Sequence, residues 1–145
     1  MKLKFIYVDT PFWRAEVGRI ALFMGDIKFD DVRIKRDNFS TAKETGTLRD
    51  GTVLPFHQVP CLVVDDVSIA QTGAIARFCG KQSGLYPTND DVKAAKIDDL
   101  IDFATDLTVM IESTRTETDE NKRLQARGDL ACLLYTSDAA DDWFC

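Results

Sequence analysis

An alternation of apolar and charged residues opens the chain and predicts a β-strand. Leu3, Phe5 and Tyr7 occupy every second position, with Lys2 and Lys4 among their neighbours. A period of two is typical of a strand that buries one face. We therefore expect the chain to begin with a strand whose apolar side packs into a core.

The next apolar residues recur at helical spacing and predict a helix that Gly25 ends. They are Val17, Ile20, Ala21 and Met24. Thr10 and Pro11 predict the helix start, because threonine is a favourable cap and proline at the first helical position loses no hydrogen bond. A second strand is expected over residues 28–35. The order strand, helix, strand predicts parallel pairing with a right-handed crossover.

The middle of the chain predicts a hairpin followed by a helix. Residues 37–54 are polar and predict an irregular connection, with a short helix over residues 40–44. Residues 61–64 and 67–70 predict two antiparallel strands joined by a tight turn. Thr72 then predicts the cap of a helix with apolar residues on one face, namely Ile75, Phe78 and Cys79.

The remainder of the chain predicts helices. Residues 80–87 predict a connection, after which Thr88 or Asn89 can cap a long helix. This helix carries an apolar stripe made of Ile97, Leu100, Ile101, Ala104, Leu107 and Ile111. Residues 119–131 predict another helix.

Composition restricts the classes of function. The chain has 145 residues, 45% of them hydrophobic and 29% charged, as in a soluble globular protein. Its formal net charge of −6 argues against nucleic-acid binding that depends on clustered Lys and Arg. No apolar run is long enough to span a membrane, and the first residues lack a signal core. These features predict a cytoplasmic protein.

Cysteine and histidine usage argues against a metal centre. The cysteines lie at widely spaced positions with no C-x-x-C pair, and His57 is the only histidine in the chain. A zinc site or a dithiol redox pair needs closely spaced ligands of these types. Cys61 and Cys79 are therefore expected to be small buried hydrophobic residues.

Three motifs resemble the glutathione-binding half of cytosolic glutathione transferases. They are the run Val59-Pro60-Cys61-Leu62-Val63-Val64-Asp65, the run Gln71-Thr72-Gly73-Ala74-Ile75-Ala76-Arg77-Phe78 and the triplet Leu85-Tyr86-Pro87. The resemblance covers about residues 2–112 and is similar in pattern to the sigma class. It implies an α/β thioredoxin-like domain, βαβ followed by ββα around a mixed four-stranded sheet, with a cis peptide bond before Pro60.

The same resemblance implies a division of the chain. Residues 1–81 correspond to the thioredoxin-like domain, 82–88 to the linker, and 89–145 to part of an all-helical domain that is truncated relative to the family. Residues 132–145 match nothing expected of the family, and they resemble the translation of a sequencing-library adapter. A divergent native terminus is the alternative.

The resemblance also implies how a glutathione thiol would be activated. A positioned hydroxyl donor can lower the pKa of the bound thiol, which is otherwise mostly protonated near neutral pH. Tyr7 matches the catalytic tyrosine of the alpha, mu, pi and sigma classes, with one extra residue between it and Arg14. Thr10 is the competing donor, since theta-like and zeta-like enzymes use a hydroxyl just before the first helix. Arg14 matches the arginine that braces the tyrosine, although a surface ion pair would explain it as well.

Further residues match positions that bind glutathione in the family. Gln71 and Thr72 match the pair that binds the γ-glutamyl carboxylate at a helix start, an arrangement that favours anions. Val59 would pair its main chain with the cysteinyl residue, and Pro60 fixes that segment. The side chains expected near the rest of the tripeptide are those of Gln58, Lys43 and Phe39. Phe39 stands where the sigma class has tryptophan, whose ring N–H a phenylalanine lacks.

One acidic residue on the long helix completes the implied site. Asp98, with Asp102 as the alternative, could match the aspartate that family dimers extend to the γ-glutamyl amine of the partner subunit. A solvated acidic helix face explains either residue equally simply. The resemblance thus implies a homodimer that binds glutathione as co-substrate and conjugates it to a small electrophile, with no role for membrane or nucleic acid.

Two other functions stay open. Sigma-like relatives include prostaglandin isomerases. The fold also serves as a non-catalytic module for binding or assembly in crystallins and translation-factor subunits, since fold does not fix function.

Overall fold

A computed structural model describes the backbone of residues 1–11 and 13–138, and the side chains of this range up to Cys132. The chain forms two compact units, of which the first comprises Met1–Ile101 and the second begins at Asp102. The first unit takes in the predicted domain, the predicted linker and the first part of the long helix. The predicted boundaries at residues 81 and 88 remain predictions.

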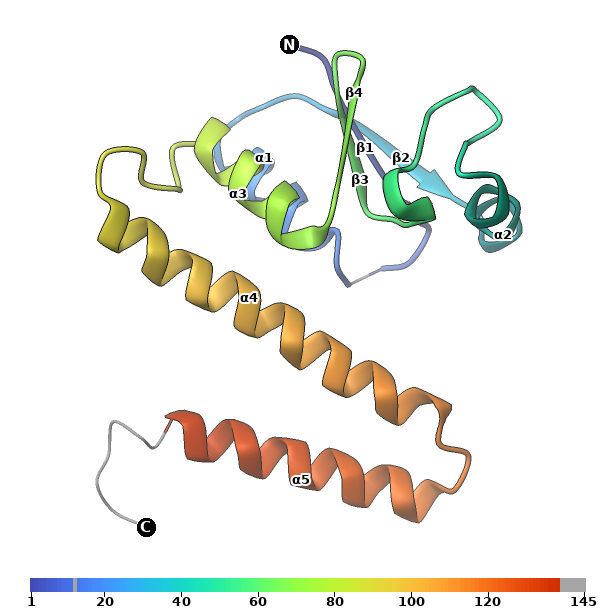
Figure 1. The fold of residues 1–145 in the computed structure, drawn as a ribbon, viewed down its shortest axis with the longest axis vertical. Helices are drawn as coiled ribbons and strands as arrows, with labels where there is room; N and C mark the ends of the chain where they lie inside the picture. Colours follow the sequence, from blue (N-terminus) through green and yellow to red (C-terminus); the bar gives the residue numbers. More distant parts are fainter. Residues whose placement is uncertain (12, 139–145) are drawn as a thin grey trace. The chain divides into compact units, whose positions relative to one another are not determined.

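The first unit is built on a mixed four-stranded sheet, as predicted (Figure 1). Its strands are β1 (Leu3–Val8), β2 (Asp30–Ile34), β3 (Cys61–Val64) and β4 (Val67–Ala70), arranged in the order β2-β1-β3-β4. β1 pairs in parallel with β2 and antiparallel with β3, which in turn pairs antiparallel with β4. The parallel pair requires the crossover helix that the sequence supplies between the two strands.

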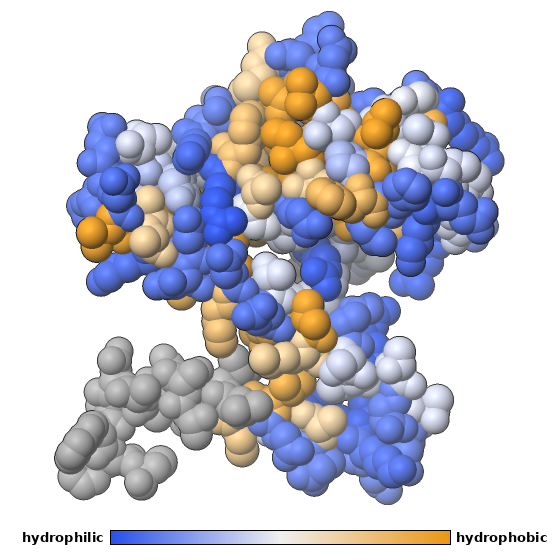
Figure 2. Space-filling model, viewed as in Figure 1, coloured by the Kyte–Doolittle hydropathy of each residue, from blue (hydrophilic) through white to orange (hydrophobic). Residues whose placement is uncertain are grey.

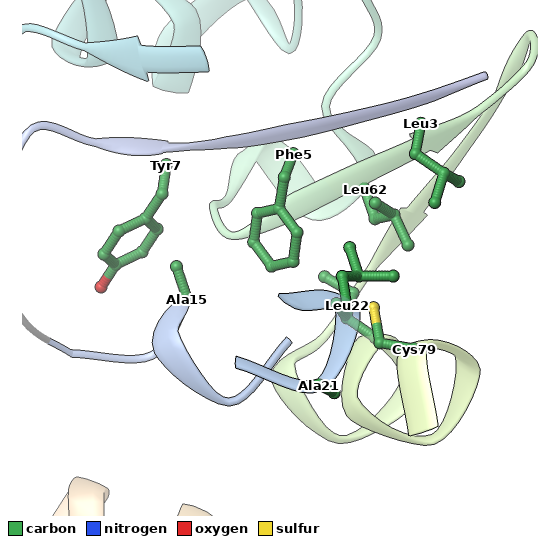
Figure 3. Packing of buried hydrophobic residues seen from close by; sticks show 9 residues of the cluster. Leu3, Phe5, Tyr7, Ala15, Ala21, Leu22, Leu62 and Cys79 are labelled. Carbon is green, nitrogen blue, oxygen red and sulfur yellow. The ribbon is translucent and has the colours of Figure 1, made fainter. Parts of the chain in front are cut away.

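Helices α1 (Glu16–Met24) and α3 (Thr72–Gln82) cover one face of this sheet. The strand positions Leu3, Phe5 and Tyr7 face them, and Figure 3 shows the Phe5 ring directed toward Leu22. Each large side chain fully buried there contributes about 1.5–3 kcal/mol to folding. α1 approaches the strand closely at Gly18, where a Cβ atom would lie 2.5 Å from the Phe5 ring.

The opposite face is covered by helix α2 (Arg36–Thr45) and the segment before β3. The second buried cluster lies on this face and consists of Ile6, Ile34, Ala42, Leu54, Cys61 and Val63. The segment includes the short 3-10 turn η1 (Pro55–His57). Successive strand residues thus point alternately into two hydrophobic cores, one on each side of the sheet.

The predicted start of the first helix is wrong. α1 begins at Glu16, with Ala15 in the cap position and no side-chain cap, so Thr10 does not cap it and Pro11 is not its first residue. The backbone of Trp13 has φ 139°, which a helix cannot include, and the Glu16 N–H donates to the Trp13 carbonyl at 3.0 Å. The helix can therefore begin only after this turn.

Other element boundaries also differ from expectation. α2 spans ten residues rather than the short predicted segment, and β2 begins at Asp30 rather than Lys28. Thr72 is the first residue of α3 and not its cap, a position that Gln71 occupies with φ 73° and no side-chain hydrogen bond. Backbone geometry, rather than the preference of threonine, sets this helix start.

Two long helices follow, α4 (Asp91–Ser113) and α5 (Glu120–Asp138), separated by η2 (Thr114–Thr116). Asp90 caps α4 through the Lys93 N–H at 3.0 Å, so Thr88 and Asn89 do not. Asp119 caps α5 by accepting from Asn121 and Lys122. No helix in the described part of the chain is long and apolar enough to cross a membrane.

α5 continues past the predicted end at residue 131 and reaches Asp138. It therefore includes the first half of the segment, residues 132–145, for which the sequence predicted no counterpart in the family. Residues 139–145 of that segment lie outside the described residues.

Candidate functional site

The strand registers bring several of the predicted site residues to one end of the sheet. Ile6 of β1 pairs with Cys61, the first residue of β3, so the end of β1, which includes Tyr7, lies beside the segment that enters β3. Cys61 also pairs with Ala70, the last residue of β4, so Gln71 follows at the same end. Segments that are far apart in sequence thus meet where β1 and β4 end and β3 begins.

Tyr7 lies near the end of β1 and is 6% exposed. Its ring belongs to the core cluster under α1 and α3, close to Ala15. Figure 3 shows its hydroxyl pointing away from Phe5 and Leu22, toward the outside of the cluster. The residue combines a fixed ring with a hydroxyl at the rim, which is the geometry that a positioned donor needs.

Thr10 and Arg14 lie in the turn between β1 and α1. The Thr10 N–H donates to the Val8 carbonyl at 2.9 Å, and its side chain is half-buried. Arg14 precedes the helix by two residues and is also half-buried. It forms no ion pair within the described residues, so no acidic partner supports the alternative interpretation of Arg14 as part of a surface ion pair.

The Val59–Pro60 peptide bond is cis, as the resemblance implied. Val59 is half-buried and packs against both core clusters. Its main-chain N–H and C=O have no hydrogen-bond partner among the described residues. The exposed residue before it, Gln58, has extended backbone angles, so this segment presents a strand-like edge.

The N-terminus of α3 lies at the same end of the sheet. Its first turn lacks a side-chain cap, and the Ile75 N–H is the first to bond within the helix, to the Gln71 carbonyl at 3.0 Å. The N–H groups of the preceding three residues are therefore available to an acceptor from outside the helix. Such a helix start carries a partial positive charge and favours anions.

α2 supplies two of the predicted residues, on one face of the helix. Phe39 is half-buried against the second core cluster, and Lys43 lies four residues later and is exposed. The His57 ring reaches the same helix, with Nδ1 3.0 Å from the Lys43 carbonyl oxygen. Sequence reasoning gave His57 no role. Its only signal was the proximity of a single histidine to the Val-Pro motif.

Asp98 has partners within its own chain. One carboxylate oxygen accepts from Arg77 Nε at 2.6 Å and from the Tyr86 hydroxyl at 3.0 Å. The hydrogen bond from Arg77 is the main reason that the pKa of Asp98 lies below its ordinary value. The pKa of Tyr86 is raised, first by desolvation and then by its bond to Asp98. This cluster joins α4 to α3, and Asp102 on the same helix is exposed.

The two described core cysteines are unsuited to nucleophilic chemistry. Cys61 and Cys79 are fully buried, in agreement with the prediction. Burial raises the pKa of the Cys61 thiol and raises that of Cys79 to about 11. Both therefore stay protonated near neutral pH, because only the thiolate is an effective nucleophile.

Residues 3–80 match the family described as "Glutathione S-transferase, N-terminal domain". Glutathione S-transferase 2 of Caenorhabditis elegans is 33% identical over 91 residues, which are 63% of this chain and 44% of that protein. Hematopoietic prostaglandin D synthase of Gallus gallus is 34% identical over 93 residues, 62% of this chain and 43% of that one. The chain thus spans less than half the length of these curated relatives.

Solved structures of glutathione S-transferases and prostaglandin synthases are similar to this chain in fold. A structure of prostaglandin synthase D of Nilaparvata lugens superposes with a TM-score of 0.74 at 32% identity, covering 90% of this chain and 60% of that one. A glutathione S-transferase of Ascaris lumbricoides gives a TM-score of 0.70 at 26% identity, covering 99% of this chain and 70% of that one.

Proposed function

Because the chain belongs to the glutathione S-transferase family, we propose that its first unit binds glutathione and that the protein conjugates it to small electrophiles. One observation carries the proposal: Tyr7, the Val59–Pro60 segment and the start of α3 converge at one end of the sheet. The family uses glutathione as a co-substrate, and no cofactor is needed for this chemistry. A cytoplasmic location and a role in detoxification are part of the proposal.

The main chain of Val59 holds the cysteinyl residue of glutathione. An extended peptide can pair with a free strand edge through main-chain hydrogen bonds, and Val59 offers both an N–H and a C=O without a partner in the described chain. Pro60 itself contributes no N–H, so the pairing is confined to the residue before it.

The γ-glutamyl carboxylate sits at the start of α3. The Thr72 hydroxyl and the free N–H groups of the first turn donate to it, with Gln71 beside them. The glycyl end lies toward α2, where Lys43 supplies a positive charge. Gln58, in the segment before β3, offers its amide to the glutathione backbone. Phe39 offers no donor, so we expect weaker binding of the glycyl carboxylate than a tryptophan at this position would give.

The Tyr7 hydroxyl activates the thiol. It donates to the sulfur of bound glutathione and stabilises the thiolate, which then attacks the electrophile. Arg14, half-buried and without an ion pair in the described chain, braces Tyr7 and the glutathione site. Thr10 is the competing donor. Its half-buried side chain lies in the turn that follows β1, as does that of Arg14, so substitution is needed to decide between Tyr7 and Thr10 as the donor.

Assignment to the sigma class and a homodimeric assembly complete the proposal. Asp98 is then the candidate for contact with glutathione bound to the partner subunit. Its bonds to Arg77 and Tyr86 favour a structural role within the chain instead.

A glutathione titration by calorimetry tests the binding site. Thr72→Ala is expected to weaken glutathione binding about tenfold, since it removes a hydrogen bond to a charged group. Thr72→Ser keeps the hydroxyl and is the matched control, expected to bind within about twofold of the unchanged protein. Equal loss in both variants would contradict the role of the hydroxyl. Absence of binding by the folded, unchanged protein would favour the non-catalytic module.

Tyr7→Phe tests the activating donor. We expect conjugation of a general electrophile to fall about 100-fold or more while glutathione affinity changes little, because the hydroxyl acts on the sulfur and not on the tripeptide backbone. Thr10→Val is the comparison. A rate that survives Tyr7→Phe but is lost in Thr10→Val would transfer the role to Thr10.

Prostaglandin isomerisation is a second candidate activity. It is favoured by the prostaglandin synthases among the similar proteins and structures. Turnover of a prostaglandin endoperoxide in preference to a simple aryl halide would select it.

A further inference from the structure

The side chain of His57 joins the end of α2 to the segment before β3. Nδ1 of its ring is 3.0 Å from the Lys43 carbonyl oxygen. A carbonyl can only accept, so Nδ1 carries the hydrogen and donates. Lys43 lies in the last turn of α2, where carbonyl groups have no partner within the helix. The histidine therefore satisfies a main-chain acceptor that would otherwise need water.

Two further contacts place the ring and its segment. A Cβ atom on Gly46 would lie 2.6 Å from Nε2, so the ring rests directly on the glycine that ends α2. The Leu54 N–H also donates to the Gly46 carbonyl at 2.8 Å. The segment is thus tied to the end of α2 through both its main chain and His57.

The segment itself is in an unfavourable conformation. Phe56 and His57 have φ of 58° and 54°, the left-handed region that residues other than glycine seldom adopt. The His57 N–H donates to the Leu54 carbonyl at 3.0 Å, which closes the turn. Such a conformation persists only where surrounding contacts hold it, and here the side-chain bond to α2 is one of them.

We propose that His57 is a positioning residue of the glutathione site, which fixes α2 relative to the Gln58–Val59–Pro60 segment through its hydrogen bond to the Lys43 carbonyl. This inference rests on the proposed function. α2 carries Lys43 and Phe39, whereas the next segment carries Gln58 and Val59, so the two sides of the glycyl and cysteinyl positions meet at this bond. His57 itself does not touch glutathione.

Three substitutions separate the hydrogen bond from the backbone conformation. His57→Asn keeps a donor close to the place of Nδ1, and asparagine tolerates positive φ. His57→Asp has nearly the same shape and the same tolerance but cannot donate. His57→Gly removes the side chain and adopts positive φ without strain. Agreement between the Asp and Gly variants excludes an effect of the added charge alone.

Two measurements on the 145-residue chain test the proposal. The first is amide hydrogen exchange without glutathione. Exchange at Leu54 and at position 57 is expected to accelerate about threefold to tenfold in the Asp and Gly variants, with Phe5 in β1 unchanged and the Asn variant close to the original. The second is glutathione titration by calorimetry, in which the same two variants are expected to bind about threefold to tenfold more weakly.

The outcomes distinguish this proposal from the proposed function. Unchanged exchange and affinity in the Asp and Gly variants would overturn the role of His57 while leaving glutathione binding in place. Equal losses in all three variants, Asn included, would also overturn it, because the donor would then be irrelevant. If the original protein binds no glutathione, the proposed function fails, and a change in exchange then identifies His57 as a purely structural tie.

Discussion

Gly46 is the residue at which backbone conformation and side-chain crowding coincide. It ends α2 with φ 74°, and its missing Cβ leaves the space that the His57 ring occupies. A side chain here must both adopt a left-handed conformation and displace the ring. The two costs are separable because Gly51 has a similar φ of 84° with no heavy atom within 4 Å of its Cβ position.

Gly46→Ala is expected to lower the free energy of unfolding by about 2 kcal/mol. About 1 kcal/mol arises from the left-handed conformation and about 1 kcal/mol from loss of the His57 hydrogen bond. Gly51→Ala, the matched control, is expected to cost only the first part. Urea unfolding followed by circular dichroism measures both, and equal costs for the two variants would contradict the crowding at Gly46.

Asp50 is expected to titrate at unusually low pH. Hydrogen bonds from Thr52, and then from Lys4 at 3.0 Å, lower its pKa from 3.8 to about 2. Since the folded value lies below the ordinary one, ionised Asp50 adds stability above about pH 4, and this contribution is lost as the pH falls toward 2. The side chain is 57% exposed, so the contribution is below about 1 kcal/mol.

Carboxyl carbon NMR measures this pKa directly. Thr52→Val removes the hydroxyl but keeps the main-chain N–H that donates to Asp50 at 3.0 Å, so the midpoint should rise part of the way toward 3.8. Lys4→Met should raise it by a smaller amount. A midpoint near 3.8 in the unchanged protein would contradict this hydrogen-bond network around Asp50.

Local sequence signals identified some site residues and missed others. Pro60 and its cis bond followed from the family motif, and the placement of Tyr7 in a buried strand followed from the alternation of apolar residues. His57 could not be found this way, because its partner is a main-chain carbonyl on another element. Nor could the caps at Asp90 and Asp119 be separated from their polar neighbours, since several residue types satisfy the same pattern.

Between elements, α1 is attached to β2 by a nearly buried arginine. Arg19 is 6% exposed, donates to Glu16 at 2.6 Å and contacts Asp31 at 2.7 Å and 2.9 Å. The Nε contact has hydrogen-bond geometry, whereas Nη2 approaches the same oxygen without it. The guanidinium also lies 5.6 Å from the centre of the Phe5 ring. The two carboxylates thus balance the charge of the guanidinium, and the Phe5 ring packs against it.

Arg19→Ala is expected to lower the free energy of unfolding by about 2–3 kcal/mol. Removing a buried charge from its pair usually costs 3–5 kcal/mol, but Glu16 and Asp31 are partly exposed and Asp31 keeps Arg33 at 2.8 Å. Arg19→Met retains the packing over Phe5 and should cost about 1 kcal/mol less than alanine. Urea unfolding checks both, and a cost for methionine that exceeds that for alanine would contradict this account.

Element types were more predictable than element ends. The sequence predicted the four strands of the sheet and, in the described chain, helices α1, α3, α4 and α5, but only a short segment of α2. The start of α1 was predicted wrongly, because the Trp13 backbone interrupts a good capping sequence. Only part of α2 was predicted, because this ten-residue helix is mostly polar. α2 buries only Ala42 fully, so its apolar signal was too weak to detect.

At the scale of the whole molecule, apolar surface is left uncovered. Figure 2 shows hydrophobic residues on the first unit over the β3–β4 hairpin and the segment before it, where Val53, Phe56 and Val67 are 57%, 71% and 65% exposed. α4 has no fully buried residue, and Leu100 and Val109 are 69% and 56% exposed. Exposed patches of this kind favour association with other surfaces.

We therefore expect the 145-residue chain to self-associate in a concentration-dependent way. Replacing Leu100 and Val109 with glutamine should reduce the average mass observed by sedimentation velocity, because it removes apolar area from α4. It should leave the free energy of unfolding in urea within about 0.5 kcal/mol of the original, since neither side chain is buried. Replacing the exposed polar residues Lys93 and Lys96 with glutamine on the same helix is the control and should not change the mass.

A single species of constant mass at all concentrations would show that this surface drives no open-ended association. If that species has the mass of two chains, the proposed homodimer would be supported instead.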